Sequence, residues 1–310
     1  MFKSIKVALV AASFLLPAFL APQSTIAREP AAPAGTARMT VTVIGKGDKT
    51  PREPGKDDLQ LTVGNERKQV GSWAKEDKLY LAILIDESLE SNVASQWNDL
   101  RAFIMAQPAS TSVAVAYARN SSAMVAQDFT DNHELAAKAL RIPLGTISGG
   151  SSPYLAVADW LKRWPDNDAR GSLILISSGI DFFRSGFGPI YPDVDSDISL
   201  AQKKNVNLWN IYSPSAGHRG HSFYLLNNAQ LNLSKMTGEA GGESYYLGTS
   251  APVTFKPYLD EIQKHLANQY ILSFSGDGGA KGKLVRARLR TEASDIEFMY
   301  ANQAFLPPSR

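Results

Sequence analysis

The segment LYLAILIDESLES, residues 79–91, joins an apolar run to a cluster of oxygen-bearing side chains. Residues 80–85 are almost wholly apolar, which is typical of a strand buried on both faces of a parallel sheet. Asp86 follows directly, with Ser88 and Glu90 close behind it. Because ligands in such sheets bind beyond the carboxyl ends of strands, this junction indicates a binding loop.

Apolar strands of this kind alternate with helical patterns along most of the chain. Residues 172–176 are a second apolar strand, and the pattern of residues 206–212 predicts a further strand. Apolar side chains recur at helical spacing in residues 95–106 and 153–164. Residues 79–274 therefore predict an α/β fold: a doubly wound, mostly parallel, Rossmann-like sheet with helices on both faces.

Shorter β patterns flank this region on both sides. The segment 39–76 and the segment 275–310 each contain alternating strand patterns, but neither is large enough to bury a core alone. We expect the two segments to pack together as one small β module beside the α/β domain. Residues 39–44 are expected to pair with the C-terminal strands.

The N-terminus has the layout of a secretory signal peptide. Lys3 and Lys6 precede an apolar run over residues 7–20, and small residues at Thr25 and Ala27 suit a signal peptidase. We expect cleavage after Ala27, so that the signal comprises residues 1–27. The protein is then secreted or periplasmic, with an Ala- and Pro-rich linker at residues 28–38 and no transmembrane segment after cleavage.

Composition excludes several kinds of chemistry. The chain has no cysteine, which rules out disulfides and thiol catalysis, and its formal net charge is only +2. The basic run at residues 286–290 alternates with apolar side chains and indicates the solvent-exposed face of a strand. Nucleic acid is therefore not an expected partner.

Three loops at the expected carboxyl edge carry hydroxyls and carboxylates. One begins at Asp86, another covers residues 149–152, and another covers residues 177–181. Because parallel strands deliver such loops to one edge, we expect them to converge. Their oxygen atoms are of the type that Mg²⁺ prefers as ligands.

This order of residues resembles the von Willebrand factor A (VWFA) domain family over residues 79–274. The chain is also similar to secreted bacterial VWFA-related proteins that place such a domain between short β segments. Residues 58–63 with 67–70, and residues 268–274, carry that resemblance. In the family, an Asp-x-Ser-x-Ser loop, a Thr and a distant Asp form a metal-ion-dependent adhesion site, whose metal holds an acidic residue of a partner protein.

The resemblance implies a degenerate version of that metal site. Asp86 and Ser88 match the first two positions, whereas Glu90 replaces the second serine. Ser151 stands for the threonine, and Ser178 stands where the distant aspartate belongs. On this reading, Asp86, Ser88 and Ser151 hold Mg²⁺ weakly. The alternative is that Asp86, Ser88 and Ser178 only cap loops through hydrogen bonds.

An aromatic-rich loop leaves the same edge and is a candidate partner-binding surface. Aromatic residues and arginine are enriched where proteins contact one another. The candidate residues are Phe182, Phe183, Arg184, Phe187 and Tyr191. The alternative is that this loop folds back onto its own domain.

Together these patterns predict a non-catalytic, extracytoplasmic protein-binding module of the adhesion or scaffold type, with another protein as its partner. Binding is expected through loops at the carboxyl edge of the sheet, with or without Mg²⁺. Two alternatives stay open. One is a hydrolase that uses Asp86 and Glu90 with Ser151 or Ser178, and the other is a purely structural subunit of an envelope assembly.

Overall fold

The structure, a computed structural model, describes residues 35–146, 151–184, 191–217, 221–246 and 248–309. All of them belong to the compact unit Ala31–Arg310. The expected signal peptide, residues 1–27, and most of the expected linker lie outside the described residues. None of the helices in the described ranges has the length and apolar character of a membrane span.

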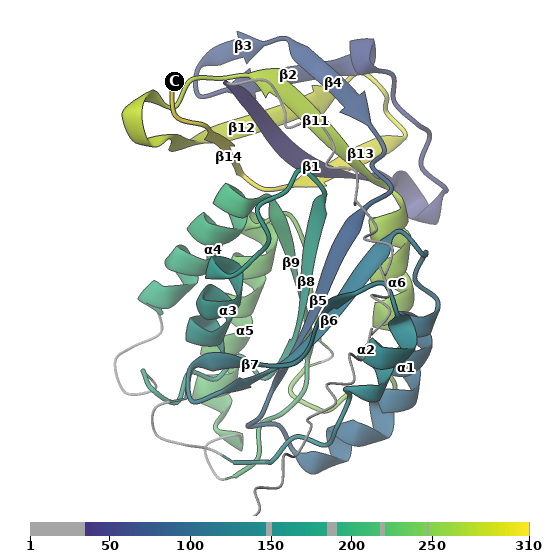
Figure 1. The fold of residues 1–310 in the computed structure, drawn as a ribbon, viewed down its shortest axis with the longest axis vertical. Coiled ribbons are helices and arrows are strands. Elements are labelled where there is room, and N and C mark those ends of the chain that lie inside the picture. Colours follow the sequence, from purple (N-terminus) through teal and green to yellow (C-terminus); the bar gives the residue numbers. More distant parts are fainter. Residues whose placement is uncertain (1–34, 147–150, 185–190, 218–220, 247, 310) are drawn as a thin grey trace, which may run out of the picture. The chain divides into compact units, whose positions relative to one another are not determined.

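The α/β part is built on a six-stranded sheet with the order β10-β9-β8-β5-β6-β7 (Figure 1). All neighbouring strands run parallel except β6 and β7, which form an antiparallel pair. The strands are β5 (Leu79–Asp86), β6 (Thr111–Arg119), β7 (Ser122–Thr130), β8 (Arg170–Ser177), β9 (Val206–Tyr212) and β10 (Ser244–Tyr245). This confirms the predicted mostly parallel sheet.

Helices cover both faces of this sheet, which explains why its central strands lack polar alternation (Figure 1). The helices α1, α2 and α6 pack on one face, and α3, α4 and α5 pack on the other. Their bounds are α1 (Trp97–Met105), α2 (His133–Lys138), α3 (Pro153–Lys162), α4 (Pro192–Lys204), α5 (Phe223–Glu239) and α6 (Lys256–Ala267). Short 3₁₀ helices are η1 (Lys46–Asp48), η2 (Lys56–Asp58), η3 (Ser91–Gln96) and η5 (Gly279–Lys281).

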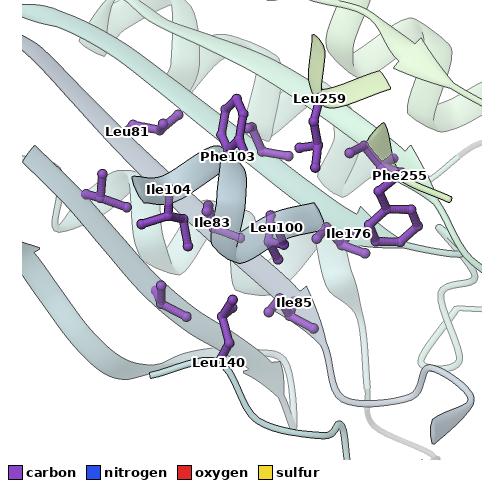
Figure 2. Close-up of a cluster of buried hydrophobic side chains, with 14 of the residues drawn as sticks. Leu81, Ile83, Ile85, Leu100, Phe103, Ile104, Leu140, Ile176, Phe255 and Leu259 are labelled. Atoms are coloured by element: carbon purple, nitrogen blue, oxygen red, sulfur yellow. The ribbon is translucent and has the colours of Figure 1, made fainter. Parts of the chain in front are cut away.

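Strand β5 sends alternate side chains into two separate cores. Leu81, Ile83 and Ile85 pack against Leu100 and Phe103 of α1 (Figure 2). The intervening Ala82 and Leu84 join the core on the opposite face. Burial of each large apolar side chain stabilises the fold by about 1.5–3 kcal/mol. A fully apolar strand is therefore what this position in the sheet requires.

The flanking segments form a β-sandwich of two antiparallel four-stranded sheets, ordered β13-β1-β11-β4 and β14-β12-β2-β3. The strands are β1 (Thr36–Gly45), β2 (Leu59–Val63), β3 (Glu66–Lys68), β4 (Val70–Ala74), β11 (Gln269–Ser275), β12 (Lys283–Thr291), β13 (Ile296–Tyr300) and β14 (Gln303–Leu306). Both sheets contribute to one apolar core, which includes Met39, Leu61, Leu272 and Leu289. The expected pairing of residues 39–44 with C-terminal strands is present, with Val41 opposite Tyr300.

One boundary of the sequence-based division needs correction. Residues 270–274 were expected to end the α/β domain, but β11 pairs with β1 and β4 of the sandwich. The apolar run of β11 is explained by its central place in that sheet, where Leu272 and Phe274 face the sandwich core.

The sandwich joins the α/β part near the amino ends of the parallel strands. Strand β4 leads directly into β5, and the Thr40 amide donates to the Asn205 side chain at 2.7 Å. The Val43 amide also donates to the Asn268 carbonyl at 2.9 Å. The carboxyl edge of the six-stranded sheet, where the candidate site lies, is therefore the end that the sandwich does not cover.

Candidate functional site

Three adjacent strands deliver the candidate residues to one edge of the sheet. Strand β8 lies between β5 and β9, and all three run parallel. Strand β5 ends at Asp86 and β8 ends at Ser177, while Ser213 follows the end of β9. The loops after β5 and β8 lie together as expected. The third loop that joins them follows β9 and was not among the three loops of the sequence prediction.

Asp86 is buried and fully engaged in hydrogen bonds. Its Oδ1 accepts from the Ser88 amide at 2.9 Å, and its Oδ2 accepts from the Ser177 hydroxyl at 2.8 Å. Burial raises the pKa of Asp86, and the hydrogen bonds from Ser88 and Ser177 offset part of that rise. The carboxylate thus ties the loop after β5 to the end of β8.

Ser215, which sequence reasoning missed, bridges the first and third loops. Its hydroxyl lies 3.1 Å from the Ser88 hydroxyl and is also hydrogen-bonded to the Ser178 hydroxyl. All three serines are buried. We call Asp86, Ser88, Ser177, Ser178 and Ser215 the serine cluster.

The backbone around Ser215 reinforces this closure. Leu89 and Ser215 form an antiparallel bridge, the Ala216 amide donates to the Ser88 carbonyl at 2.7 Å, and the Glu90 amide donates to the Pro214 carbonyl at 3.2 Å. The loop after β9 is therefore fastened to the loop after β5. Only the position of β9 beside β8 could have pointed to Ser215, and the sequence does not give the order of the strands.

The second loop is attached at a different point. The Ser152 hydroxyl donates to Asp181 Oδ2 at 2.8 Å, and the Ser151 carbonyl accepts from the Phe183 amide at 3.2 Å. Within the described ranges, no hydrogen bond joins Ser151 to Asp86 or Ser88. Ser152 also caps α3, because its hydroxyl accepts from the Leu155 amide.

The two glutamates of the first loop point to different partners. The Glu90 carboxylate accepts from the Asn92 side chain at 3.2 Å and lies 3.5 Å from His221 Nε2. Glu87 is buried, forms an ion pair with Arg141, and accepts from the Leu144 amide at 2.7 Å. Glu87 was not singled out in the sequence, yet it fixes the loop that carries Leu144.

As arranged, the oxygen atoms of the serine cluster are engaged in hydrogen bonds within the cluster. A Mg²⁺ ion needs oxygen atoms that face a common point at about 2.1 Å. Both oxygens of Asp86 already accept hydrogen bonds, and the hydroxyls of Ser88 and Ser178 bond to Ser215. Among the described residues, no group of three or more His, Cys, Asp or Glu side chains is placed to hold a metal. The geometry matches the loop-capping alternative, while metal binding itself stays a prediction for titration.

The aromatic loop divides into buried and exposed members. Phe182 and Tyr191 are buried against their own domain, so the sequence-based proposal that they contact a partner is corrected. Phe183 is 49% exposed, and Arg184 forms an ion pair with Asp193 at 2.5 Å. Phe187 lies outside the described residues.

Other exposed apolar side chains lie on loops, or on the first turn of α5, at the same edge. We define the apolar rim as five residues that are each about half exposed or more: Ile142, Leu144, Phe183, Phe223 and Tyr224. Phe223 and Tyr224 begin α5, whose next residues, Leu225 and Leu226, turn inward to a buried cluster with Phe182.

Solved structures with a similar fold were found, whereas no protein-family model and no curated protein sequence matches the chain. An aerotolerance-related membrane protein from Bacteroides fragilis NCTC 9343, with multiple mutations to serines, aligns at 10% identity and a TM-score of 0.46, covering 61% of this chain and 98% of that chain. The SpRpn10 VWA domain aligns at 10% identity and a TM-score of 0.40, covering 60% and 95%. The human COPII-coat protein Sec24c aligns at 10% identity and a TM-score of 0.40, covering 73% and 43%.

These likenesses concern the fold and say nothing of what this chain binds. The doubly wound, mostly parallel α/β fold predicted from the sequence is confirmed in the sheet itself, by its parallel core strands, its antiparallel edge strand and its helices on both faces.

Proposed function

We propose that this protein is a non-catalytic, extracytoplasmic protein-binding module that captures another protein on the apolar rim without a metal ion. The observation that carries the proposal is the rim itself. Five large apolar side chains are exposed at the one edge of the sheet that the sandwich leaves open, three on loops and two on the first turn of α5. Exposed apolar side chains that gather in one place are a mark of interaction sites.

The rim stands on a rigid support, which favours binding with little loss of conformational entropy. Leu144 is tied through its amide to buried Glu87, and Phe183 is tied through its amide to the Ser151 carbonyl. Beneath them, the serine cluster joins the loops after β5, β8 and β9 by hydrogen bonds. The hydroxyl of Ser215 thus supplies the connection that a metal ion would otherwise make.

The hydrolase alternative has weaker support from the same geometry. Catalysis by Asp86 with Glu90 needs a carboxyl group within reach of a nucleophile and of substrate. Asp86 is buried under hydrogen bonds from Ser88 and Ser177, while Glu90 faces Asn92 and His221. We therefore place the protein-binding function first.

Site-specific photo-crosslinking tests the proposal. A photoreactive amino acid is placed at Leu144 or Phe223 and, as matched exposed apolar controls on helices, at Leu231 or Met105. The full chain is irradiated in an envelope extract of its own organism, with and without EDTA. We expect the same crosslinked partner from both rim positions, none from the controls, and no effect of EDTA.

Affinity measurements then quantify how much the side chains of the apolar rim contribute to partner binding. Once the partner is identified, Leu144→Ala and Phe223→Ala should each weaken binding about tenfold or more, because central apolar anchors contribute 1–2 kcal/mol or more. Leu231→Ala should leave the affinity unchanged. Equal crosslinking at rim and control positions contradicts the rim proposal, and loss of the partner in EDTA contradicts its metal-free form.

A further inference from the structure

A second surface, on the sandwich, is formed by alternate arginines of β12. Arg286, Arg288 and Arg290 are exposed, whereas the intervening Ala287 and Leu289 are buried in the sandwich core. Side chains two residues apart on one strand lie about 7 Å from each other. The three guanidiniums therefore form a regular row on the outer face of this sheet.

A fourth arginine, Arg67, lies to one side of this row, on strand β3 of the same sheet. Arg288 pairs with Thr62 of β2, and Thr62 pairs with Arg67 of β3, so all three side chains point to the same face. Two strand spacings separate Arg67 from Arg288, which is about 10 Å. We call Arg67, Arg286, Arg288 and Arg290 the arginine face.

These four charges have no oppositely charged partner among the residues that the structure describes. In the part of the chain that the structure describes, none of the four guanidiniums forms an ion pair or a hydrogen bond, whereas Arg38, Arg141 and Arg163 each pair with a carboxylate. Two acidic residues of the sandwich are engaged with other groups: Glu66 pairs with Lys68, and Glu292 accepts from Gln60. Four like charges held together repel one another, so an external anion stabilises this arrangement.

We propose that the arginine face binds the anionic surface of a phospholipid membrane. A planar guanidinium recognises phosphate oxygens with paired hydrogen bonds, and the phosphates of a bilayer form a two-dimensional array. That array reaches all four arginines together, whereas a single extended polyanion that follows β12 leaves Arg67 to one side.

The surrounding residues favour charge alone as the basis of recognition. The outward side chains opposite the arginines are Gln60, Thr62 and Gln303, so the middle of the face has no aromatic ring on which a nucleic-acid base could stack.

The position of this face also suits a membrane. Strand β1 hydrogen-bonds to the α/β part at Thr40 and Val43, and Asn302, between β13 and β14, hydrogen-bonds to Gln202 and Glu239. Strands β2 and β3 lie on the other side of the sandwich (Figure 1). A membrane bound there therefore leaves the carboxyl edge of the six-stranded sheet uncovered.

Vesicle co-sedimentation of the full chain tests this proposal. The wild type is compared with R286Q/R288Q/R290Q on vesicles of phosphatidylglycerol with phosphatidylcholine, and on phosphatidylcholine alone as the reference. We expect the wild type to prefer the anionic vesicles. The triple variant should bind them roughly a hundredfold more weakly. Each arginine contributes about 1 kcal/mol, and about 1.4 kcal/mol corresponds to a tenfold change in affinity. About 0.5 M NaCl should abolish the preference by screening.

A matched variant keeps the test specific. R101Q/K138Q/K256Q removes three exposed cations from helices of the α/β part and should bind like the wild type. Thermal unfolding of both variants verifies folding, and Arg67→Gln, which changes one charge, should weaken binding about fivefold.

The proposal is overturned if the triple variant, once shown to be folded, binds anionic vesicles as tightly as the wild type. It is also overturned if the wild type binds anionic and neutral vesicles equally. Binding to a polyphosphate chain without binding to anionic vesicles overturns it as well.

Discussion

Asp197 is a buried carboxylate on α4, and neither of its oxygens has a hydrogen-bond partner within the described residues. Burial raises the pKa of Asp197 well above its usual range, the carboxylate of Asp193 adds to that rise, and Lys162 opposes it. The folded state therefore holds this proton over a pH range in which the unfolded chain has released it. By linkage, stability then falls as pH rises from the ordinary aspartate value towards the raised one.

Asp197→Asn should remove this pH dependence. The free energy of unfolding of the variant, relative to wild type, should increase with pH by up to about 1.4 kcal/mol per unit above pH 4. Denaturant titrations from pH 4 to pH 8 measure that difference. Asp195→Asn, an exposed neighbour on the same helix, is the control for the loss of a surface carboxylate. A pH-independent difference for Asp197→Asn contradicts this account of Asp197.

Ser215→Ala should destabilise the carboxyl edge although it removes a single oxygen atom. The change leaves the buried hydroxyls of Ser88 and Ser178 without their shared partner, which costs about 1–3 kcal/mol. Hydrogen exchange should accelerate at the Glu90 and Ala216 amides, which fasten the two loops. Ser95→Ala, at an exposed position of η3, should cost less than about 0.5 kcal/mol. Equal stability losses in the two variants are inconsistent with a structural role for Ser215.

At the scale of elements, sequence patterns predicted where strands and helices lie better than they predicted which strands pair with one another. The runs at 79–85 and 172–176 are apolar on both faces, so they could only be central strands of a covered sheet. The run at 270–274 looks similar locally, but it pairs with β1, more than 200 residues away in the chain. A strand's own sequence reports burial, whereas the identity of its neighbour depends on the whole fold.

The same limit applies to the candidate site. Asp86 and Ser178 could be placed at one edge because each directly follows a strand or nearly so. Ser215 could not, because nothing in its own loop shows that β9 lies beside β8. Phe182 and Phe183 are adjacent aromatics, and only the packing of α5 decides that the first is buried and the second exposed.

Asn205 combines two roles at the end of α4, and two substitutions separate them. It adopts a left-handed conformation with φ of 53°, and its side chain accepts from the Thr40 amide at 2.7 Å. Asn205→Gly keeps the backbone conformation and loses the hydrogen bond, which should cost about 1 kcal/mol. Asn205→Ala adds a left-handed strain of about 1–2 kcal/mol.

The free energy of unfolding of Asn205→Ala should therefore fall below that of Asn205→Gly, which should fall below wild type. Denaturant unfolding measures the series. An alanine variant as stable as the glycine variant shows that the backbone conformation contributes nothing here.

At the scale of the whole molecule, the sandwich makes the two ends of the chain depend on each other. Its core takes Met39 and Leu61 from before the α/β part, and Leu289 and Leu306 from after it. Because β1 lies between β11 and β13, and β2 between β3 and β12, neither flanking segment forms its sheets alone. The sequence prediction of one β module from both flanks rested on this shortage of core within each segment.

A chain that ends at Ser275 tests this dependence. It keeps β1, β2, β3, β4 and β11 but loses β12, β13 and β14. Met39, Val41 and Leu272 therefore lose the half of the opposite layer that β12 and β14 supply. We expect dye binding to exposed apolar surface and a midpoint of thermal unfolding at least about 10 °C lower, because several buried side chains at about 1.5–3 kcal/mol each are uncovered. Far-ultraviolet circular dichroism should still report the helices of the α/β part. If the shortened chain unfolds at the wild-type temperature without binding dye, the C-terminal strands do not stabilise the sandwich. The β12 arginines would then lie on a strand that the fold does not need.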